Sequence, residues 1–414
     1  MKALLLISSY FILLLSCSDK TVDPGPAPDY EPISMPAGGD QVITASNIFG
    51  IDLFKKIAFT EPDSMNLFIS PTSISLALAM TRDGANGATL DSMTYALRME
   101  GLSDDEINAS YRDLISGLTS VDPEVQLNIA NSIWYRQDFQ IETPFLATNA
   151  DYYNAEVRSL DFNSPDAKEI INSWVEDQTN HKIRNLISEI NPVDIMFLIN
   201  AIYFKGSWKI KFDKDATRAQ NFYLIDGSSK EVAMMHLTDT ILYQSNDLFQ
   251  AIQLKYGSGN YAMVIILPRE GKKCGNIINP LSPSQWNSWM QGFVSQKVVV
   301  TLPSFKFGYD IKLNDVLSDM GMGISFDRYN ADFTRINHLG GLYINYVKHK
   351  AFVEVNEEGT EAAAATVVVV ANRVSAQPDE TIYFTANKPF LFAIIERSTK
   401  TIVFMGRLSD PSVY

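Results

Sequence analysis

Few residues in this 414-residue sequence are spaced for catalysis or for metal binding. No GxSxG, HExxH or GxxxxGK[ST] motif occurs, and Cys17 and Cys274, the two cysteines, lie too far apart to form a paired-cysteine metal motif. The four histidines lack metal-site spacing and are interpreted as surface or hydrogen-bonded core residues: His181, His236, His338 and His349. The sequence therefore predicts no metal and no cofactor. A triad assembled from distant residues is the catalytic alternative.

One cation stands out in the carboxyl-terminal part of the chain. Arg373 is the only basic residue between Glu361 and Lys388, and it follows an apolar run. In an exposed, extended loop, an arginine without a local carboxylate partner would fit the carboxylate at the base of a trypsin-like protease pocket. The alternative interpretation is an ordinary surface arginine in a connecting segment.

The run that ends at this arginine, residues 357–373, combines two opposing structural preferences. Thr360 is suited to cap a helix, and residues 361–365 are strong helix formers. Residues 367–370 are β-branched valines, which favour a strand. Neither charge nor proline interrupts residues 362–371, and such a segment, if exposed, pairs readily with an open sheet edge. On composition alone, the run predicts a buried strand with an alanine-rich beginning.

The amino terminus predicts export. Lys2 is followed by an apolar segment over residues 3–15, which is too short to span a bilayer but suits the core of a signal peptide. Residues 14–17, Leu-Leu-Ser-Cys, resemble the lipobox of bacterial lipoproteins, which implies a signal peptide of residues 1–16 and acylation of Cys17. The implied location is a lipid anchor in the bacterial cell envelope, at the outer membrane or cell surface. Simple cleavage near Ser16 or Ser18, giving a soluble secreted protein, is the alternative.

Composition separates a short linker from one large body. Residues 17–42 are rich in proline, glycine and aspartate and predict a flexible linker. Residues 43–414 contain no further linker and no internal repeat, so we expect a single domain. Two cysteines in an exported chain exclude a disulfide framework. A formal net charge of -14 argues against nucleic acid and anionic polysaccharide as partners.

Hydrophobic periodicity places helices early and strands late in this body. Helical patterns cover residues 43–58, 70–80, 89–98, 104–119, 143–150 and 167–186. Runs of strand length that are rich in β-branched or aromatic residues cover residues 66–69, 195–203, 261–267, 297–302, 342–347 and 401–405. This segregation predicts an α+β architecture rather than alternating βαβ units.

Ordered motifs along the body resemble the serpin family. Residues 357–366, Glu-Glu-Gly-Thr-Glu-Ala-Ala-Ala-Ala-Thr, match at every position the hinge of the reactive-centre loop of inhibitory serpins. Residues 384–394, Phe-Thr-Ala-Asn-Lys-Pro-Phe-Leu-Phe-Ala-Ile, are similar to the closing signature of the family. Further matches lie within residues 66–73, 172–183, 200–208, 331–333 and 349–351. The resemblance extends from about residue 43 to the carboxyl end.

The resemblance implies the serpin fold, a single domain of three β-sheets and about nine helices with an exposed reactive-centre loop. In this family a target protease cleaves the loop and forms an acyl-enzyme. The hinge then inserts into the central sheet as an additional strand and distorts the protease before water releases it. The implied hinge residues are Glu357, Glu358, Gly359, Thr360, Glu361, Ala362, Ala363, Ala364, Ala365 and Thr366. The scissile residue lies fourteen positions after the hinge glycine, which assigns the reactive bond to Arg373 and Val374.

The resemblance also assigns residues that control sheet opening. Ser70, Ser73, Asn200 and His349 correspond to a buried polar cluster beneath the central sheet. Trp208, together with the hinge glutamate Glu357, corresponds to the place where insertion begins.

The sequence departs from the family pattern at three places. Ser304 follows Leu302-Pro303 where the family often has a basic residue, so an ion pair from this position to Glu357 is not expected. Arg335 stands where glycine is usual. Residues 374–384 are a few residues longer than typical, which leaves the scissile bond defined to within about one residue.

The resemblance implies an inhibitor that catalyses no reaction and acts as a monomer. Trypsin-like serine proteases are the expected partners, cysteine proteases are a further candidate class, and membrane contact is expected through the lipid anchor only. A non-inhibitory serpin, acting as a binding or chaperone-like protein whose loop is only a substrate, is the alternative. Such members usually carry proline or bulky charges in the hinge, and residues 357–366 contain no proline.

Overall fold

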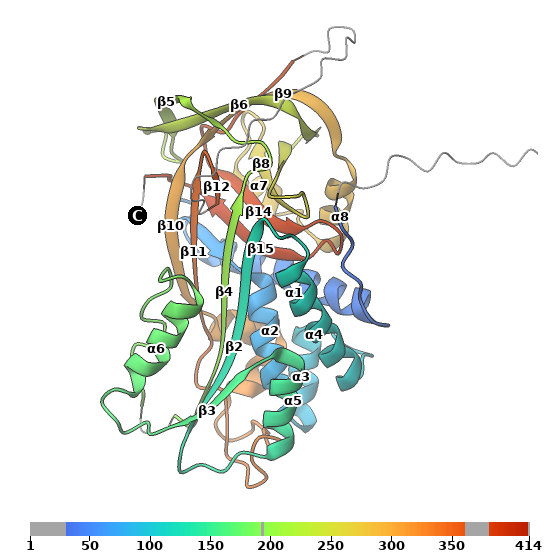
Figure 1. The fold of residues 1–414 in the computed structure, drawn as a ribbon, viewed down its shortest axis with the longest axis vertical. Helices are drawn as coiled ribbons and strands as arrows, with labels where there is room; N and C mark the ends of the chain where they lie inside the picture. The colour runs from blue at the N-terminus through green and yellow to red at the C-terminus, as the bar shows by residue number, and fades with distance from the viewer. Residues whose placement is uncertain (1–29, 192–193, 361–380, 413–414) are drawn as a thin grey trace, which may run out of the picture.

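The long strands of one sheet run along the long axis of the molecule (Figure 1). The computed structural model describes residues 30–191, 194–360 and 381–412. This six-stranded sheet has the order β10-β11-β12-β4-β2-β3, and only its β2–β3 pair is parallel. Its strands are β2 (Val125–Arg136), β3 (Glu156–Leu160), β4 (Met196–Ser207), β10 (Phe305–Lys312), β11 (Lys348–Asn356) and β12 (Gly359–Thr360).

A second, nine-stranded sheet lies across the upper part of the molecule. Its path is β1-β15-β14-β8-β7-β6-β9-β13, and β5 pairs with β6 beside this path. Its strands are β1 (Leu67–Ile69), β5 (Asp213–Tyr223), β6 (Ser229–Ser245), β7 (Phe249–Lys255), β8 (Tyr261–Pro268), β9 (Val294–Pro303), β13 (Ile382–Thr385), β14 (Phe390–Glu396) and β15 (Ile402–Leu408). Because the long strand β6 pairs with both β7 and β9, two of the three expected sheets are joined into one.

The described residues contain nine α-helices, which agrees with the predicted fold class. They are α1 (Gly39–Thr60), α2 (Pro71–Arg82), α3 (Gly87–Ala96), α4 (Asp104–Ser120), α5 (Thr143–Tyr153), α6 (Ala167–Gln178), α7 (Cys274–Ile278), α8 (Pro283–Gln291) and α9 (Asn314–Leu317). A short π-helix and a 3₁₀-helix follow at Ser318–Met322 and Gly323–Phe326. The expected helix over residues 167–186 ends early because Asn180 and His181 both adopt positive φ angles, 48° and 60°.

Two other sequence predictions need correction. Residues 342–347 are not a strand: the Ile344 amide donates to the Ser325 carbonyl (2.9 Å), and the Val347 amide donates to the Asn314 side chain (2.9 Å). The strand begins only at Lys348, where β10 provides a partner. The linker also ends earlier than residue 42, since α1 starts at Gly39 and Glu31 exchanges hydrogen bonds with Asn260 (3.1 and 2.6 Å).

Two hydrophobic cores support the six-stranded sheet. The main core joins the helices α1–α4 to both sheets. A smaller core forms where α6 covers the sheet, and in it the Trp134 and Trp174 rings meet edge to face at 6.3 Å. Residues of β4 contribute to both cores, so this strand is held from both faces.

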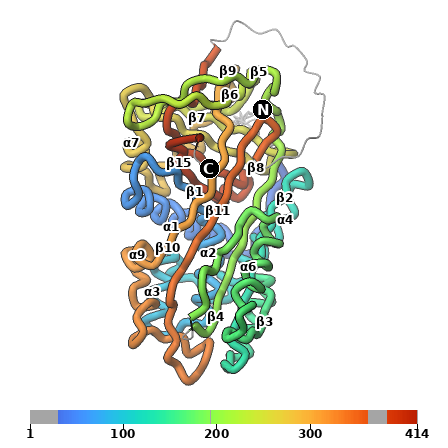
Figure 2. Tube along the Cα trace, turned by 90° about the vertical axis from the view of Figure 1, so that its left-hand side faces the viewer, coloured from blue at the N-terminus to red at the C-terminus, as the bar shows by residue number. Residues whose placement is uncertain are grey.

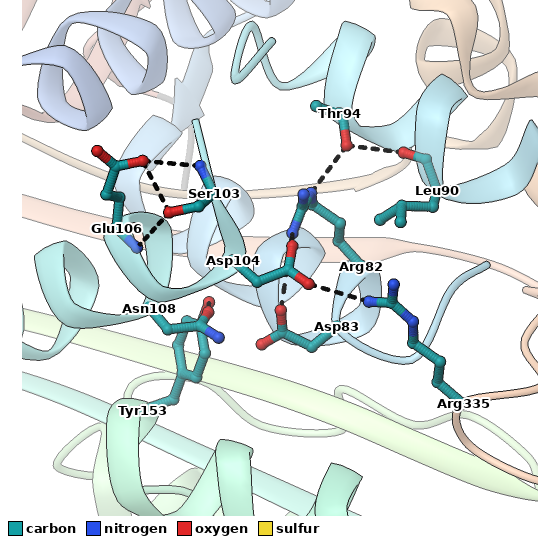
Figure 3. Close-up of polar contacts among 10 residues, drawn as sticks. All are labelled: Arg82, Asp83, Leu90, Thr94, Ser103, Asp104, Glu106, Asn108, Tyr153 and Arg335. Carbon is teal, nitrogen blue, oxygen red and sulfur yellow. Dashed lines mark hydrogen bonds and ion pairs between the residues drawn. The ribbon is translucent and has the colours of Figure 1, made fainter. Parts of the chain in front are cut away.

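A charge cluster joins the end of α2 to the start of α4 (Figure 3). Ser103 caps α4, with a reciprocal capping box between Ser103 and Glu106. The Arg82 guanidinium donates to Asp104 (2.8 Å) and to Thr94 (2.9 Å). Asp104 also accepts a hydrogen bond from Arg335 (3.0 Å), the residue that replaces the usual family glycine. Through Arg335, the cluster therefore joins the segment that precedes β11 to α2 and α4.

Asp83, which follows Arg82 at the end of α2, makes the free energy of unfolding depend on pH. Burial raises its pKa to about 7, against the opposing charge of Arg82. At pH values between 3.8, the pKa of Asp83 in the unfolded chain, and about 7, its pKa in the folded protein, Asp83 is protonated in the folded state and ionised in the unfolded state. The free energy of unfolding therefore falls as pH rises through this window, by at most about 1.4 kcal/mol per pH unit.

We expect Asp83→Asn to remove this fall, so that the variant gains stability relative to the wild type as the pH is raised from 5 to 8. Urea denaturation of both proteins across this range measures the difference. His349, whose pKa burial lowers to about 4, is common to both proteins and cancels from that difference. A pH-independent difference in unfolding free energy would contradict the prediction.

Candidate reactive-loop hinge and receiving sheet

The two residues of β12 lie between β11 and β4 in the middle of the six-stranded sheet. Thr360 is opposite Val355 of β11 on one side and Gly206 of β4 on the other. Its side chain is 3% exposed, and its hydroxyl shares a 2.6 Å hydrogen bond with the Tyr256 hydroxyl. The described chain therefore enters the sheet at the upper end of β4 and β11, with Thr360 facing the interior.

Glycine at position 359 is required by a close approach of two backbones. A Cβ atom there would lie 2.1 Å from the carbonyl oxygen of Gly206 and 2.7 Å from the Cα of Ser207. No side chain fits in this space, so Gly359 allows β12 to pair with β4.

Trp208 anchors the beginning of the hinge. Its indole Nε1 donates to the carbonyl of Asn356 (2.8 Å), and its backbone amide donates to the carbonyl of Glu358 (2.8 Å). Its ring stacks on Tyr256 at a centroid distance of 4.3 Å, and burial raises the pKa of Tyr256. Trp208 and Tyr256 thus hold both the chain that leads into β12 and Thr360 itself.

The two hinge glutamates have different partners. Glu357 accepts a hydrogen bond from the Thr217 hydroxyl (2.7 Å). The carboxylate oxygens of Glu358 lie 2.6 Å from the Nζ atoms of Lys211 and Lys214. The hydrogen bonds from these two lysines, that of Lys211 first, lower the pKa of Glu358. The hinge is therefore fastened to residues that follow β4 in the sequence. Ser304 donates its amide to the carbonyl of Ala233 (2.9 Å).

The four residues assigned to the polar cluster lie together beneath the six-stranded sheet. The Ser70 amide donates to His349 Nε2 (3.1 Å), and Ser70 Oγ accepts from the Ser73 amide (3.2 Å) at the start of α2. The Ser73 hydroxyl donates to the Asn200 side chain, which donates in turn to Asn131 of β2 (2.6 Å). These contacts link β11 through α2 to β4 and β2.

Below β12, the two strands that flank it are not paired with each other. Within the described residues, the register connects β4 and β11 only through Gly359 and Thr360. β4 and β11 run along the length of the molecule beside β10 (Figure 2). We call the space between β4 and β11 below Thr360 the β4–β11 gap. Two strand edges that face such a gap present backbone donors and acceptors to a further strand.

A family model described as serpin, serine protease inhibitor, matches residues 44–411. The chain belongs to the serpin family. A serpin-like protein of Thermococcus kodakarensis, itself uncharacterized, is 37% identical over 89% of this chain and 86% of its own length. Mouse serine protease inhibitor A3K is 35% identical over 90% of each chain. The native-state crystal structure of the thermophilic serpin Tengpin has a TM-score of 0.82 at 32% identity and covers 92% of this chain and 97% of its own.

These similarities confirm the predicted serpin fold. Serpins in general are inhibitors of proteases rather than enzymes, and many act on serine proteases. Among the described residues, no group of histidine, cysteine or acidic side chains is arranged to hold a metal ion. None of the helices in the described part of the chain is long and apolar enough to cross a membrane.

The structure places only part of the predicted serpin site. Glu357, Glu358, Gly359, Thr360, Trp208 and the polar cluster are described, and they meet at the upper end and beneath the middle of the six-stranded sheet. Residues 361–366, Arg373, Val374 and Cys17 lie outside the described residues. The roles assigned to all of these residues remain predictions.

Sequence analysis missed the contacts of Tyr256, Thr217, Lys211 and Lys214 with the serpin hinge. Tyr256 is separated from Thr360 by 104 residues, and Thr217 from Glu357 by 140, so no local pattern indicates either contact. The two lysines lie a few residues after Trp208, and their charge opposite a pair of glutamates is the one signal that was available.

Proposed function

We propose that this serpin inhibits trypsin-like serine proteases by inserting its cleaved loop into the β4–β11 gap. The observation that carries the proposal is the double pairing of β12. Thr360 is already in register with β4 and β11, at the end of the gap where a further strand would begin. Extension of this strand needs no change of register, only continuation of the same ladder.

The length of the following chain supports the proposal. Arg373 lies thirteen positions after Thr360, which corresponds to about 43 Å of extended strand. Counting the same number of residues back along β4 from Gly206 reaches position 193, just before β4 begins at Met196. A strand inserted up to Arg373 would therefore run the full length of β4, carrying an attached protease from one end of the sheet to the other.

The proposed chemistry is an interrupted hydrolysis. The protease serine attacks the carbonyl carbon of Arg373, the peptide bond to Val374 breaks, and the acyl-enzyme remains attached through Arg373. Arg373 supports a trypsin-like target because its guanidinium pairs with the carboxylate of the specificity pocket. Small hinge residues support rapid entry into the sheet, and each added ladder hydrogen bond contributes about 1 kcal/mol net.

We also propose that the serpin is exported and anchored to the cell envelope through a lipid on Cys17. The apolar segment over residues 3–15 and the Leu-Leu-Ser-Cys sequence support this location. The anchor would be the only contact with the membrane, and the folded body would act as a monomer.

Incubation with trypsin followed by denaturing electrophoresis tests the function. We expect an adduct that survives SDS and contains one trypsin joined to residues up to Arg373, with residues 374–414 released as a peptide on denaturation. Mass spectrometry of both products locates the bond, and a panel that includes a cysteine protease defines the range of targets. Complete cleavage without any adduct would overturn the proposal and indicate a non-inhibitory serpin.

A further inference from the structure

A cavity of about 210 Å³ lies between α2, the lower half of β4 and residues 341–349. Its walls come from both hydrophobic cores. Leu78 and Phe333 belong to the main core, and Leu186 and Ile187 belong to the core around α6. The cavity therefore marks the place where the two cores meet without filling the space between them.

The pattern of exposure along α2 and β4 indicates which side chains face this space. Ten of the twelve residues of α2 are buried, and the two that are not, Ala77 and Thr81, are one helical turn apart and both line the cavity. In β4, all five residues from 196 to 200 contribute to the wall; Met196, Leu198 and Asn200 are half-buried, whereas the other two are buried in the core around α6. These half-buried side chains thus line a space that they leave unfilled.

Among the polar side chains in the cavity wall, His349 and Asp194 offer a donor and an acceptor to a ligand. His349 Nε2 accepts the hydrogen bond of the Ser70 amide, and burial lowers the His349 pKa to about 4. The ring is therefore neutral at pH 7 with its proton on Nδ1, for which no acceptor occurs among the described residues. Asp194, which is 6% exposed, accepts from the Asn191 amide (2.8 Å) and the Asn345 side chain (3.1 Å).

We propose that this cavity binds a neutral alcohol or phenol with an apolar body of about eight to ten heavy atoms in all. The size follows from comparison with apolar protein cavities of about 150 Å³, which hold benzene. A hydroxyl group suits the wall because it can accept from His349 Nδ1 or donate to Asp194. An anion does not suit it, because the Asp194 carboxylate would repel it and Lys348, the cation in the wall, already pairs with Asp310 (3.2 Å).

A ligand in this position also lies on the path of loop insertion. Met196, Leu198 and Asn200 line the cavity and belong to the strand along which the β12 ladder would continue. An occupied cavity would therefore slow insertion and increase the fraction of serpin that is cleaved without trapping the protease. This consequence rests on the proposed function, whereas binding itself does not.

Calorimetric titration of the intact serpin with 4-ethylphenol tests the binding. We expect one site per molecule, with ethylbenzene binding about fivefold more weakly because it lacks one net hydrogen bond. The carboxylate 4-ethylbenzoate should not bind. Equal affinity for 4-ethylphenol and 4-ethylbenzoate would contradict the assignment of a neutral ligand, and absence of binding by 4-ethylphenol would overturn the cavity proposal.

The variant Ala77→Leu provides the structural control. Its added carbons point into the cavity from α2, so we expect the affinity for 4-ethylphenol to fall at least about tenfold while the cooperative thermal transition is retained. Unchanged affinity in a folded variant would place the ligand elsewhere and reject the site.

Trypsin reactions of the wild-type serpin with saturating 4-ethylphenol then test competition. A larger proportion of cleaved, unattached serpin is expected, after correction for the effect of the phenol on trypsin with a peptide substrate. Binding without this change would reject competition with insertion. A serpin that forms no adduct even without the phenol would instead reject the proposed function and leave the binding result standing.

Discussion

Replacing Arg373 with alanine is expected to lower the rate of adduct formation with trypsin by about two orders of magnitude. The guanidinium of the wild type can form two charge-assisted hydrogen bonds with the carboxylate of the trypsin pocket, and this pair contributes about 3 kcal/mol or more. Alanine leaves that buried carboxylate without a partner. The measurement is the second-order rate of trypsin inactivation, together with the amount of SDS-stable adduct.

Two further variants make this result specific. Arg373→Lys keeps the positive charge and should retain inhibition within about tenfold, because trypsin pockets accept both cations but pair bidentately only with arginine. Arg328→Ala removes an exposed arginine in the segment that precedes β11 and should leave the rate unchanged. If Arg373→Ala still trapped trypsin at the wild-type rate, Arg373 would not be the residue that enters the pocket, and a neighbouring bond would have to be assigned.

The sequence predicted the elements whose local signals agree with their final environment. Ser70 followed by Pro71 indicates a helix start, and α2 begins there with the Ser70 side chain as its cap. The uniformly apolar run of β8 is recognisable because every residue of this strand is buried. The hinge glycine was found by resemblance, and its physical reason, the approach of Gly206 to within 2.1 Å of a Cβ, appears only in three dimensions.

The missed elements show where local patterns fail. Most residues of β5 are exposed and polar, and its hydrogen bonds to β6 rather than an apolar face keep it in the sheet. β2 alternates buried with less buried positions over its first residues, so its signal was present, but it lies among helices where strands were not expected. Residues 342–347 show the opposite error, because they were predicted to form a strand. Their apolar and aromatic side chains instead line the cavity and pack against the core.

The site depends on contacts that no sequence pattern specifies. Tyr256 and Trp208 stack beneath Thr360, and Lys211 and Lys214 neutralise Glu358, although these groups come from three separate parts of the chain. Their common effect is to hold Thr360 in register with β4 and β11. A test of insertion needs this register, because it determines which face of the sheet each later residue of the loop would occupy.

Replacing Ala364 with glutamate is expected to convert the inhibitor into a substrate. Continuing the register of Thr360 by four residues would place position 364 between Ile202 of β4 and Ala351 of β11, on the same face as the buried Thr360. Ile202 is 5% exposed and Ala351 is 2% exposed. Burying a carboxylate on this face without a partner costs several kcal/mol, which would slow insertion so that deacylation occurs first.

The matched control is Ala365→Glu, which makes the same chemical change on the opposite face. In the continued register, position 365 lies between Ala201 of β4, which is buried in the core around α6, and Lys350 of β11. The Lys350 ammonium group already donates to the Arg184 carbonyl (2.9 Å) and can neutralise the new carboxylate. We expect Ala365→Glu to keep most of its inhibitory stoichiometry, while Ala364→Glu yields mainly cleaved, unattached serpin. Since both variants leave Arg373 intact, both should be cleaved by trypsin. Equal trapping by the two variants would contradict insertion in the β12 register, because only insertion distinguishes one face of the strand from the other.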